Sequence, residues 1–332
     1  KLSDIRNKIV NLKDLKYHEN DLNKLEREIT ILHAEFANKI LKNSNNEIDL
    51  IGFHGHTIYH NPEEKISKQL GDGRLLSQLL KKKIAYNFRE NDIKNNGNGA
   101  PLTPIYHSAI AKKIKKNNII FLNIGGITNE TFIDEKYKFS AKDLGPGNCL
   151  IDRWVRENSN YNFDKGGYFA KSGKINRLIL EQVSEHSNKI SEGRSILETQ
   201  RSLDIKNYDL SFVRGLTLED GAATLTEYTA DLLCEAIFKF SFFYRDLPKD
   251  LYNKLILTGG GRKNNYLVEK MREKLKNNFK IIMIDDFDID GDFIESQAFA
   301  FLAIRSLKKL PITFPETTGC KNPCQGGELI SF

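Results

Sequence analysis

Two short segments hold residue types that together could transfer a phosphoryl group. Asn123-Ile124-Gly125-Gly126-Ile127 is followed, twenty residues after Asn123, by Asp143-Leu144-Gly145-Pro146-Gly147-Asn148. Glycines allow backbone N–H groups to approach an anion closely, and a nearby aspartate can move a proton or hold a metal. A third cluster, Gly259-Gly260-Gly261, also follows an apolar run. One such cluster is usually a tight turn, but three, each after an apolar run, indicate phosphoryl transfer from a nucleotide.

Asp143 has two interpretations in its sequence context. Aspartate is favoured at helix N-caps, and Pro146 with the apolar residues that follow it fits the start of a helix. Alternatively, the Gly-Pro-Gly turn holds Asp143 rigidly as a general base that faces the γ-phosphate. The local sequence leaves both interpretations open.

Histidines and an aspartate follow the first apolar runs of the chain. His54 and His56 flank Gly55. Two histidines without a carboxylate give little support for a metal site, so a hydrogen bond to a substrate or to a loop is favoured. Asp72 lies in a Gly-Asp-Gly triplet, where it is either a turn carboxylate or a ligand for a polyol.

Three more charged residues lie where a strand ends or a helix begins. Arg89 and Asp92 follow a strand-like run, where Arg89 could clamp a carboxylate or phosphate with two hydrogen bonds. A surface ion pair is the alternative for these two residues. Glu295 opens a helix, where the helix dipole alone already favours a carboxylate.

Composition excludes several classes of protein. The 332 residues carry a net charge of +6, with 39% hydrophobic and 28% charged residues, and no apolar run is long enough to cross a bilayer. The polar, Lys-rich start does not resemble a signal peptide. Lys81–Lys83 and the Lys112–Lys116 stretch lack interleaved aromatic residues, so they predict solvated helix faces and no nucleic-acid partner. We therefore expect a soluble, cytoplasmic protein.

The four cysteines give little evidence of a metal site. Cys320 and Cys324 are close in sequence, whereas Cys149 and Cys234 are isolated. A zinc site needs four ligands, and no histidine cluster accompanies the pair. Reduced thiols are the expectation for a cytosolic chain.

Apolar patterns predict alternating strands and helices, which is typical of an α/β fold. The pattern predicts helices over 22–40, 149–155, 217–240, 267–275 and 295–307, and a turn that leads into a helix over 69–80. It predicts strands over 48–51, 84–88, 119–124, 131–133, 255–257 and 281–284. The polar candidates repeatedly follow strand ends, where open α/β sheets bind ligands. A Lys/Asn-rich stretch predicts a boundary near 117, with one lobe over 1–117 and a second over 118–332, whose C-terminal tail packs back on the first.

Taken together, these motifs resemble the anhydro-N-acetylmuramic acid kinases, a family of the sugar-kinase, Hsp70 and actin ATPase superfamily. The resemblance covers nearly the whole chain in order. Its main segments are 52–57, 69–73, 88–92, 99–102, 123–129, 143–154, 172–173, 219–226, 259–264, 295–300 and 317–319.

The resemblance implies a two-lobed actin-like ATPase of ribonuclease H-like fold, with its active site in the cleft between the lobes. It implies an ATP- and Mg²⁺-dependent kinase of peptidoglycan recycling that opens 1,6-anhydro-N-acetylmuramic acid with water and phosphorylates the freed 6-hydroxyl. A homodimer is also implied. Asp143 matches the general base. Positions matched to sugar binding are His54, Asp72, Arg89, Asp92 and Glu295. Positions matched to ATP binding are Asn123, Gly125, Gly126, Gly145, Gly147, Asn148, Gly259, Gly260, Gly261 and Asn264.

The chain departs from the family pattern at several positions. Leu144 replaces a usual threonine, Asn96 and Asn98 replace glycine and glutamine, and Arg201–Asp204 is all that remains of a longer polar motif. Nothing before Ile48 resembles the glycine-rich phosphate-binding hairpin with which the family begins. We expect either a truncated sequence or a lost phosphate clamp, and the alternative function is a catalytically impaired sugar- or nucleotide-binding homologue.

Overall fold

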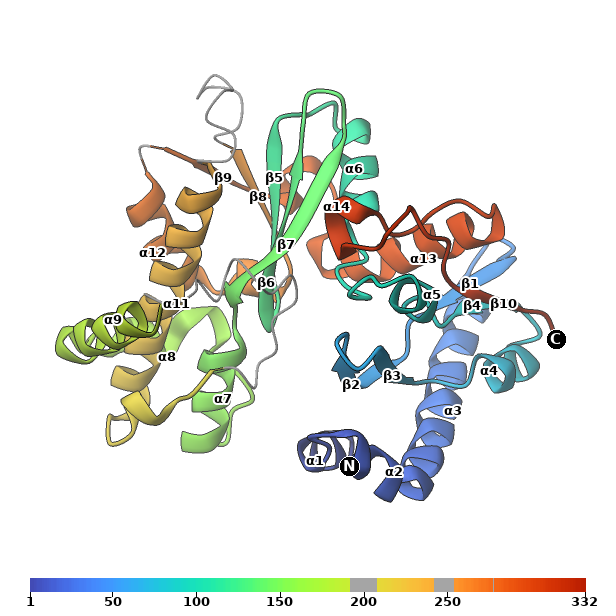
Figure 1. The fold of residues 1–332 in the computed structure, drawn as a ribbon, viewed down its shortest axis with the longest axis horizontal. Coiled ribbons are helices and arrows are strands. Elements are labelled where there is room, and N and C mark those ends of the chain that lie inside the picture. The colour runs from blue at the N-terminus through green and yellow to red at the C-terminus, as the bar shows by residue number, and fades with distance from the viewer. Residues whose placement is uncertain (192–207, 242–253, 277) are drawn as a thin grey trace. The chain divides into compact units, whose positions relative to one another are not determined.

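The computed structural model describes residues 1–191, 208–241, 254–276 and 278–332 (Figure 1). The Arg201–Asp204 motif lies outside these described residues. The chain forms two compact units, one of residues 1–106 with 295–332 and the other of residues 107–294. These bounds differ from the predicted boundary near residue 117. Residues 295–332 join the first unit because Phe299, Leu302 and Ile312 pack with Phe88 and Leu102 in one apolar cluster.

The first unit is built on a small mixed sheet. Strand β1 (Leu50–Phe53) runs parallel to β4 (Lys83–Tyr86), and β10 (Glu328–Ile330) pairs with β4 antiparallel. A separate hairpin joins β2 (His56–Asn61) to β3 (Ile66–Leu70). The helices of this unit are α1 (Leu2–Lys8), α2 (Leu12–Tyr17), α3 (Glu19–Asn43), α4 (Gly73–Leu80), α5 (Glu90–Lys94), α13 (Ile294–Leu307) and α14 (Pro315–Thr318).

Helix α3 only partly follows its apolar pattern. Leu22 and Ile29 are buried against α1 and the β2–β3 hairpin, whereas Leu32, Phe36 and Ile40 are exposed. The periodicity therefore predicted the helix correctly but not which of its turns are covered within this chain.

The second unit contains a five-stranded sheet in the order β7-β6-β5-β8-β9. Strands β5 (Ile119–Ile124), β6 (Ile127–Ile133) and β7 (Phe139–Pro146) form an antiparallel meander, and β8 (Lys254–Thr258) and β9 (Lys280–Met283) are parallel to β5. The α-helices are α6 (Pro104–Lys113), which begins in the first unit, α7 (Cys149–Asn158), α8 (Tyr168–Ser172), α9 (Arg177–Ser191), α11 (Leu218–Ser241) and α12 (Asn265–Leu275). Short 3₁₀ helices cover Lys165–Gly167, Ser211–Val213, Gly260–Lys263, Ile284–Phe287 and Gly291–Phe293.

Helices cover both faces of this sheet (Figure 1). Leu122 and Leu257 pack against α11 and α12 on one face, in the largest apolar cluster of the unit. On the other face the ring of His107 in α6 stacks on Phe121 at 4.8 Å and hydrogen-bonds to Thr131 Oγ1 at 2.8 Å. Burial lowers the pKa of His107 to about 3, so this imidazole is neutral.

One ion pair lies inside the sheet. Glu130 of β6 and Lys142 of β7 are directly opposite each other, with 3.8 Å between Oε1 and Nζ and side-chain exposures of 4% and 22%. Burial raises the pKa of Glu130 to about 7 and lowers that of Lys142 to about 8. Lys142 directly precedes Asp143 on β7, so the ion pair joins the two strands just before that residue.

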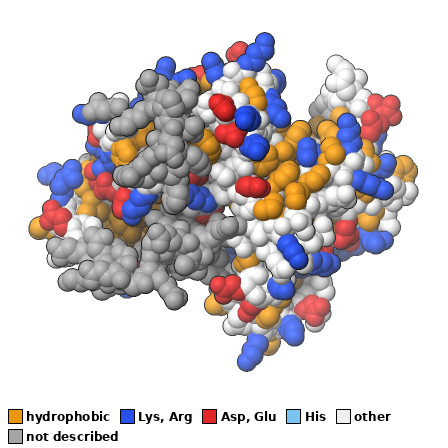
Figure 2. All heavy atoms as spheres, turned by 45° about the horizontal axis from the view of Figure 1, so that its top comes forward, with side chains coloured by type: hydrophobic (Ala, Val, Ile, Leu, Met, Phe, Trp, Pro, Cys, Tyr) orange, Lys and Arg blue, Asp and Glu red, His pale blue; other side chains and the backbone are white. Residues whose placement is uncertain are grey.

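The surface gives no sign of a large basic patch on the face drawn in Figure 2, where Lys and Arg side chains are interspersed with Asp and Glu. Among the described helices, none combines the length and the apolar character that a membrane span requires.

Candidate functional site

The three predicted glycine segments meet at one place in the second unit. Gly125 and Gly126 form the turn between β5 and β6, and their carbonyls accept hydrogen bonds from the N–H groups of Asn148 and Gly147, each at 2.8 Å. Gly147 has no room for a side chain, because a Cβ there would overlap the Gly125 carbonyl oxygen. The turn and the start of α7 are therefore packed directly on each other.

The third segment packs against the same turn. Gly259 has a positive φ of 78°, and a Cβ on it would lie 2.5 Å from Asn123 Oδ1. A Cβ on Gly261 would overlap the Ile124 side chain, and Asn148 Nδ2 would lie 2.9 Å away. Residues from the ends of β5, β7 and β8 are thus brought together, as expected for ligand binding at strand ends.

One of these glycines, Gly260, is not explained by packing within the protein. Gly126 and Gly260 are exposed, and a Cβ on Gly260 would meet no atom within 4 Å. Backbone N–H groups of exposed glycines can approach a phosphate closely. Gly145 is buried, and a Cβ on it would meet only Leu233, at 3.9 Å. Nucleotide binding at these positions stays a prediction.

We expect Gly260→Ala and Gly261→Ala to separate ligand binding from folding. Gly260→Ala should weaken ATP binding about tenfold, or ~1.4 kcal/mol, while the unfolding midpoint stays unchanged. Gly261→Ala should destabilise the fold by about 1–3 kcal/mol because its Cβ overlaps Ile124. Calorimetric titration with Mg-ATP and urea unfolding measure the two effects. Equal ATP affinity in Gly260→Ala and the parent would exclude a contact at Gly260.

Asp143 lies within β7 and does not cap a helix. The N-cap of α7 is Asn148, which makes no side-chain capping bond. The helix-cap interpretation of Asp143 is therefore wrong. Asp143 is half-buried and pairs with Asn129 of β6.

The two strands are irregular at this point. Thr128 pairs with Gly145 and Asn129 with Asp143, so Leu144 is an extra, bulged residue. Bulges often redirect a side chain beside an active site. The amide oxygen of Asn129 is buried with no hydrogen-bond partner in the described part of the chain. The role of Asp143 as general base stays a prediction.

Asn264 and Arg262 hold the third glycine segment in place. Asn264 is buried and caps α12, accepting a hydrogen bond from Leu267 N at 3.1 Å. Buried Arg262 donates to Gly259 O at 3.1 Å and to Asp285 at 2.8 and 3.1 Å. The Arg262 guanidinium lowers the pKa of Asp285 to about 2. This anchor was not predicted from the sequence, although an arginine after a glycine run, with aspartates further along the chain, could have indicated it.

The predicted sugar-binding residues all belong to the first unit. The ends of β1 and β4 both reach α13 at Phe299, whose ring lies 4.7 Å from that of His54 and 5.2 Å from that of Phe88. His54 is exposed, and half-buried Arg89 directly follows Phe88. Glu295 is exposed one helical turn before Phe299, and therefore on the same face of α13. His54, Arg89 and Glu295 thus lie on three segments that meet at Phe299.

Asp72 and Asp92 make contacts that explain their positions without a ligand. Asp72 is the N-cap of α4, and its Oδ1 accepts from Arg74 N at 2.9 Å and Leu75 N at 3.0 Å. Asp92 is 1% exposed and accepts from Gly99 N and Thr318 Oγ1, both at 2.7 Å. Sugar contacts by these two carboxylates stay predictions.

The sheet order of the second unit defines the class of protein. An antiparallel meander extended by two strands parallel to its first, with helices on both faces, is the ribonuclease H-like arrangement of actin-like ATPases. The predicted fold class is confirmed. The chain belongs to the anhydro-N-acetylmuramic acid kinase family, whose sequence profile matches residues 2–331.

Curated relatives support the same family. An anhydro-N-acetylmuramic acid kinase of Pelagibacter ubique is 48% identical over 99% of this chain and 86% of its own length. The enzyme of the same name from Brucella canis is 37% identical over 92% of this chain and 80% of its own. The chain is thus a phosphotransferase that acts on a hydroxyl group, and the family does not favour a binding-only role.

Solved structures match more weakly. An activator of 2-hydroxyisocaproyl-CoA dehydratase from Clostridium difficile with bound ADPNP has a TM-score of 0.36 and 12% identity, over 61% of this chain and 66% of its own. A xylulose kinase from Rhodospirillum rubrum has the same TM-score, 10% identity, and coverage of 61% and 41%.

Proposed function

We propose that this enzyme uses ATP to convert 1,6-anhydro-N-acetylmuramic acid into N-acetylmuramic acid 6-phosphate. The observation that carries the proposal is the meeting of three glycine segments at strand ends, with Asp143 on the adjoining strand. Its relatives' names supply the sugar. A cytoplasmic location, a homodimer and a role in peptidoglycan recycling remain predictions from the same resemblance.

In the proposed reaction, the Asp143 carboxylate takes a proton from a water molecule that attacks the anomeric carbon. The bond between that carbon and O6 breaks, O6 bonds to the γ-phosphorus, and ADP leaves. The N–H groups of Gly126 and Gly260 would bind phosphate oxygens, while His54, Arg89 and Glu295 orient the sugar. Positioning and charge stabilisation account for most catalysis of phosphoryl transfer.

The residues beside Asp143 also suit Mg²⁺. The ion prefers carboxylate and amide oxygens, and the buried Asn129 oxygen lacks a hydrogen-bond partner in the described residues. Asn129, with phosphate oxygens and water, would hold the ion. When bound, Mg²⁺ supplies neutralisation of the charge on the phosphates.

Isotope labelling tests the reaction. In H₂¹⁸O with the anhydro sugar and Mg-ATP, the proposal expects one ¹⁸O at C1 of the sugar and none in the transferred phosphate. N-acetylglucosamine, which lacks the anhydro ring, is the control and should not be phosphorylated. Label in inorganic phosphate, with no sugar phosphate formed, would indicate a plain ATPase and refute the proposal.

Glu295→Gln tests the sugar side. A hydrogen bond to a charged group contributes about 1.5–3 kcal/mol, so its loss should raise the KM for the anhydro sugar about 10–100-fold while the KM for ATP stays constant. Glu316→Gln is the matched control, because Glu316 is an exposed carboxylate in the first turn of α14. An unchanged KM for the sugar in Glu295→Gln would contradict a sugar contact. The carboxylate at the start of α13 would then be explained by its favourable interaction with the helix dipole.

A further inference from the structure

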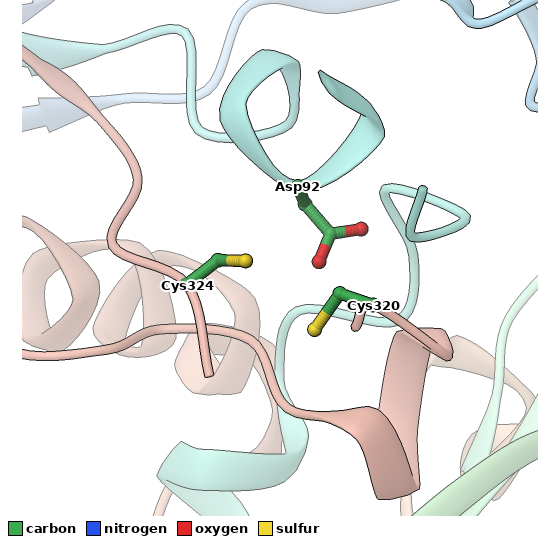
Figure 3. A group of neighbouring side chains, drawn as sticks. All are labelled: Asp92, Cys320 and Cys324. Carbon is green, nitrogen blue, oxygen red and sulfur yellow. The ribbon is translucent and has the colours of Figure 1, made fainter. Parts of the chain in front are cut away.

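Three potential metal ligands lie together in the first unit. Of the three, only Asp92 is also among the residues predicted to bind a substrate. The ligand atoms of Asp92, Cys320 and Cys324 are all within 4.8 Å of one another, and all three residues are buried. Asp92 comes from α5 and the cysteines from the C-terminal tail. Figure 3 shows the carboxylate and both thiols converging on one space.

The backbone fixes the position of each ligand. Cys324 is bridged to Thr313 by hydrogen bonds in both directions, with Cys324 N to Thr313 O at 3.0 Å. Gly319 ends α14 with a φ of 75° and so turns the chain directly into Cys320. The tail is tied to the loop after α5 by a hydrogen bond from Asn98 N to Thr318 O at 2.8 Å. The ligands are therefore held in place by ordered backbone on both sides.

The charge of Asp92 needs a partner. This carboxylate is 1% exposed, and its two hydrogen-bond donors in the described residues, Gly99 N and Thr318 Oγ1, are neutral. A buried ionised carboxylate without an opposite charge is costly. A bound cation would supply that charge. The two donors correspond to the hydrogen bonds that usually orient a metal-ligating carboxylate.

A second buried polar atom lies beside the cluster. Thr313 is fully buried, and its hydroxyl oxygen lacks a hydrogen-bond partner in the described part of the chain. The Cys324 thiol donates to Asn322 O at 3.0 Å. A water molecule completing a metal's coordination would give the Thr313 hydroxyl a partner.

We propose that Asp92, Cys320 and Cys324 bind one zinc ion, with water as the fourth ligand. Two thiolates and a carboxylate suit zinc, which accepts sulfur and oxygen ligands in tetrahedral geometry. Binding releases the two thiol protons to solvent. The ion joins α5 to the C-terminal tail and so fixes the start of α5, where Arg89 lies.

Metal analysis of the purified protein tests the site without an activity assay. After dialysis in buffer with a reductant and no chelator, we expect about one zinc per chain. Replacement of the zinc by Co²⁺ should give a thiolate-to-cobalt charge-transfer band and the visible bands of tetrahedral cobalt. X-ray absorption at the zinc edge should show two sulfur neighbours.

Variants assign the ligands. Cys320→Ser and Cys324→Ser should lose the zinc and the cobalt band, and Asp92→Asn should bind zinc more weakly. Thr318→Val removes only a supporting hydrogen bond, so zinc affinity should fall about 10–100-fold. Cys149→Ser and Cys234→Ser are the controls, because these buried cysteines lie in the second unit and should leave both signals unchanged.

Several results would overturn the proposal. The first is that the unaltered protein contains no zinc and gives no cobalt band. The second is that Cys320 and Cys324 form a disulfide under reducing conditions. The third is that Cys320→Ser still binds zinc. Circular dichroism checks that each variant is folded. If a variant unfolds, the cobalt spectrum and X-ray absorption of the unaltered protein still decide.

Discussion

Asp143→Asn is expected to lower sugar turnover by about 10²–10⁴-fold, the usual effect of removing a general base. Asparagine keeps the shape of the side chain but cannot take a proton from water. Because Asp143 lies in β7 and caps no helix, the fold and the affinity for Mg-ATP should stay unchanged. The measurement is kcat for the anhydro sugar, together with circular dichroism and calorimetric titration of ATP.

A matched carboxylate controls for general electrostatic effects. Glu135 is exposed in the turn between β6 and β7, so Glu135→Gln removes one negative charge from the same hairpin. We expect its turnover to equal that of the parent. Turnover of Asp143→Asn within a few-fold of the parent would require another base.

Lys142→Met is expected to destabilise the second unit, by less than the roughly 3–5 kcal/mol usual for a broken buried pair, because the raised pKa of Glu130 lets that carboxyl take up a proton when its cation is removed. Replacing both partners, as Glu130→Leu with Lys142→Met, should restore stability to the parent level or raise it. Trp154 is the single tryptophan and is buried in α7 of this unit, so its fluorescence reports urea unfolding there. A single variant as stable as the parent would contradict this account.

The same pair predicts how stability depends on pH. The folded pKa of Glu130, about 7, exceeds its ordinary value of 4.5, so the folded state binds more protons between these values and stability falls as pH rises. The folded pKa of Lys142, about 8, is below 10.5, so the unfolded state binds more protons there and stability rises with pH. The pair's contribution is therefore least favourable between about pH 7 and 8. Urea unfolding should show stability falling from about pH 4.5 to 7 and rising from about pH 8 to 10.5, and both slopes should be lost in the double variant.

Strands followed by glycine clusters were well predicted from the sequence. The predicted strand over 119–124 coincides with β5, and that over 255–257 lies inside β8. These strands are buried on both faces, so they appear as continuous apolar runs. The predicted start of the helix over 217–240 is also confirmed, because α11 begins at Leu218 and Asp220 N donates a hydrogen bond to Thr217 Oγ1 at 3.1 Å.

Other elements had no such pattern. The β2–β3 hairpin is polar and half-buried, and residues 69 and 70, predicted as a turn before a helix, end β3. Strand β10 has only three residues, and its pairing with β4 depends on the tail returning to the first unit. A Gly-Pro pair predicts a turn, so the extension of β7 through Pro146 was hidden, together with its bulge at Leu144.

The sequence indicated candidate residues for the site, but it did not indicate how they are arranged in space. That Gly147, Gly259 and Gly261 pack on one turn depends on sheet order, which local patterns do not encode. The burial of Asp92 depends on Thr318 and on the two cysteines, more than 220 residues away in sequence. Long-range contacts of this kind are set by tertiary packing.

The return of β10 to β4 also orders events during synthesis. Strand β4 leaves the ribosome with one side unpaired, and Glu328, its partner, follows about 240 residues later. At about 5–20 residues per second, β4 waits roughly 12–50 s. All five strands of the second unit are complete by Met283, before α13 and the tail have been made. The second unit can therefore fold while the first unit still lacks the third strand of its sheet.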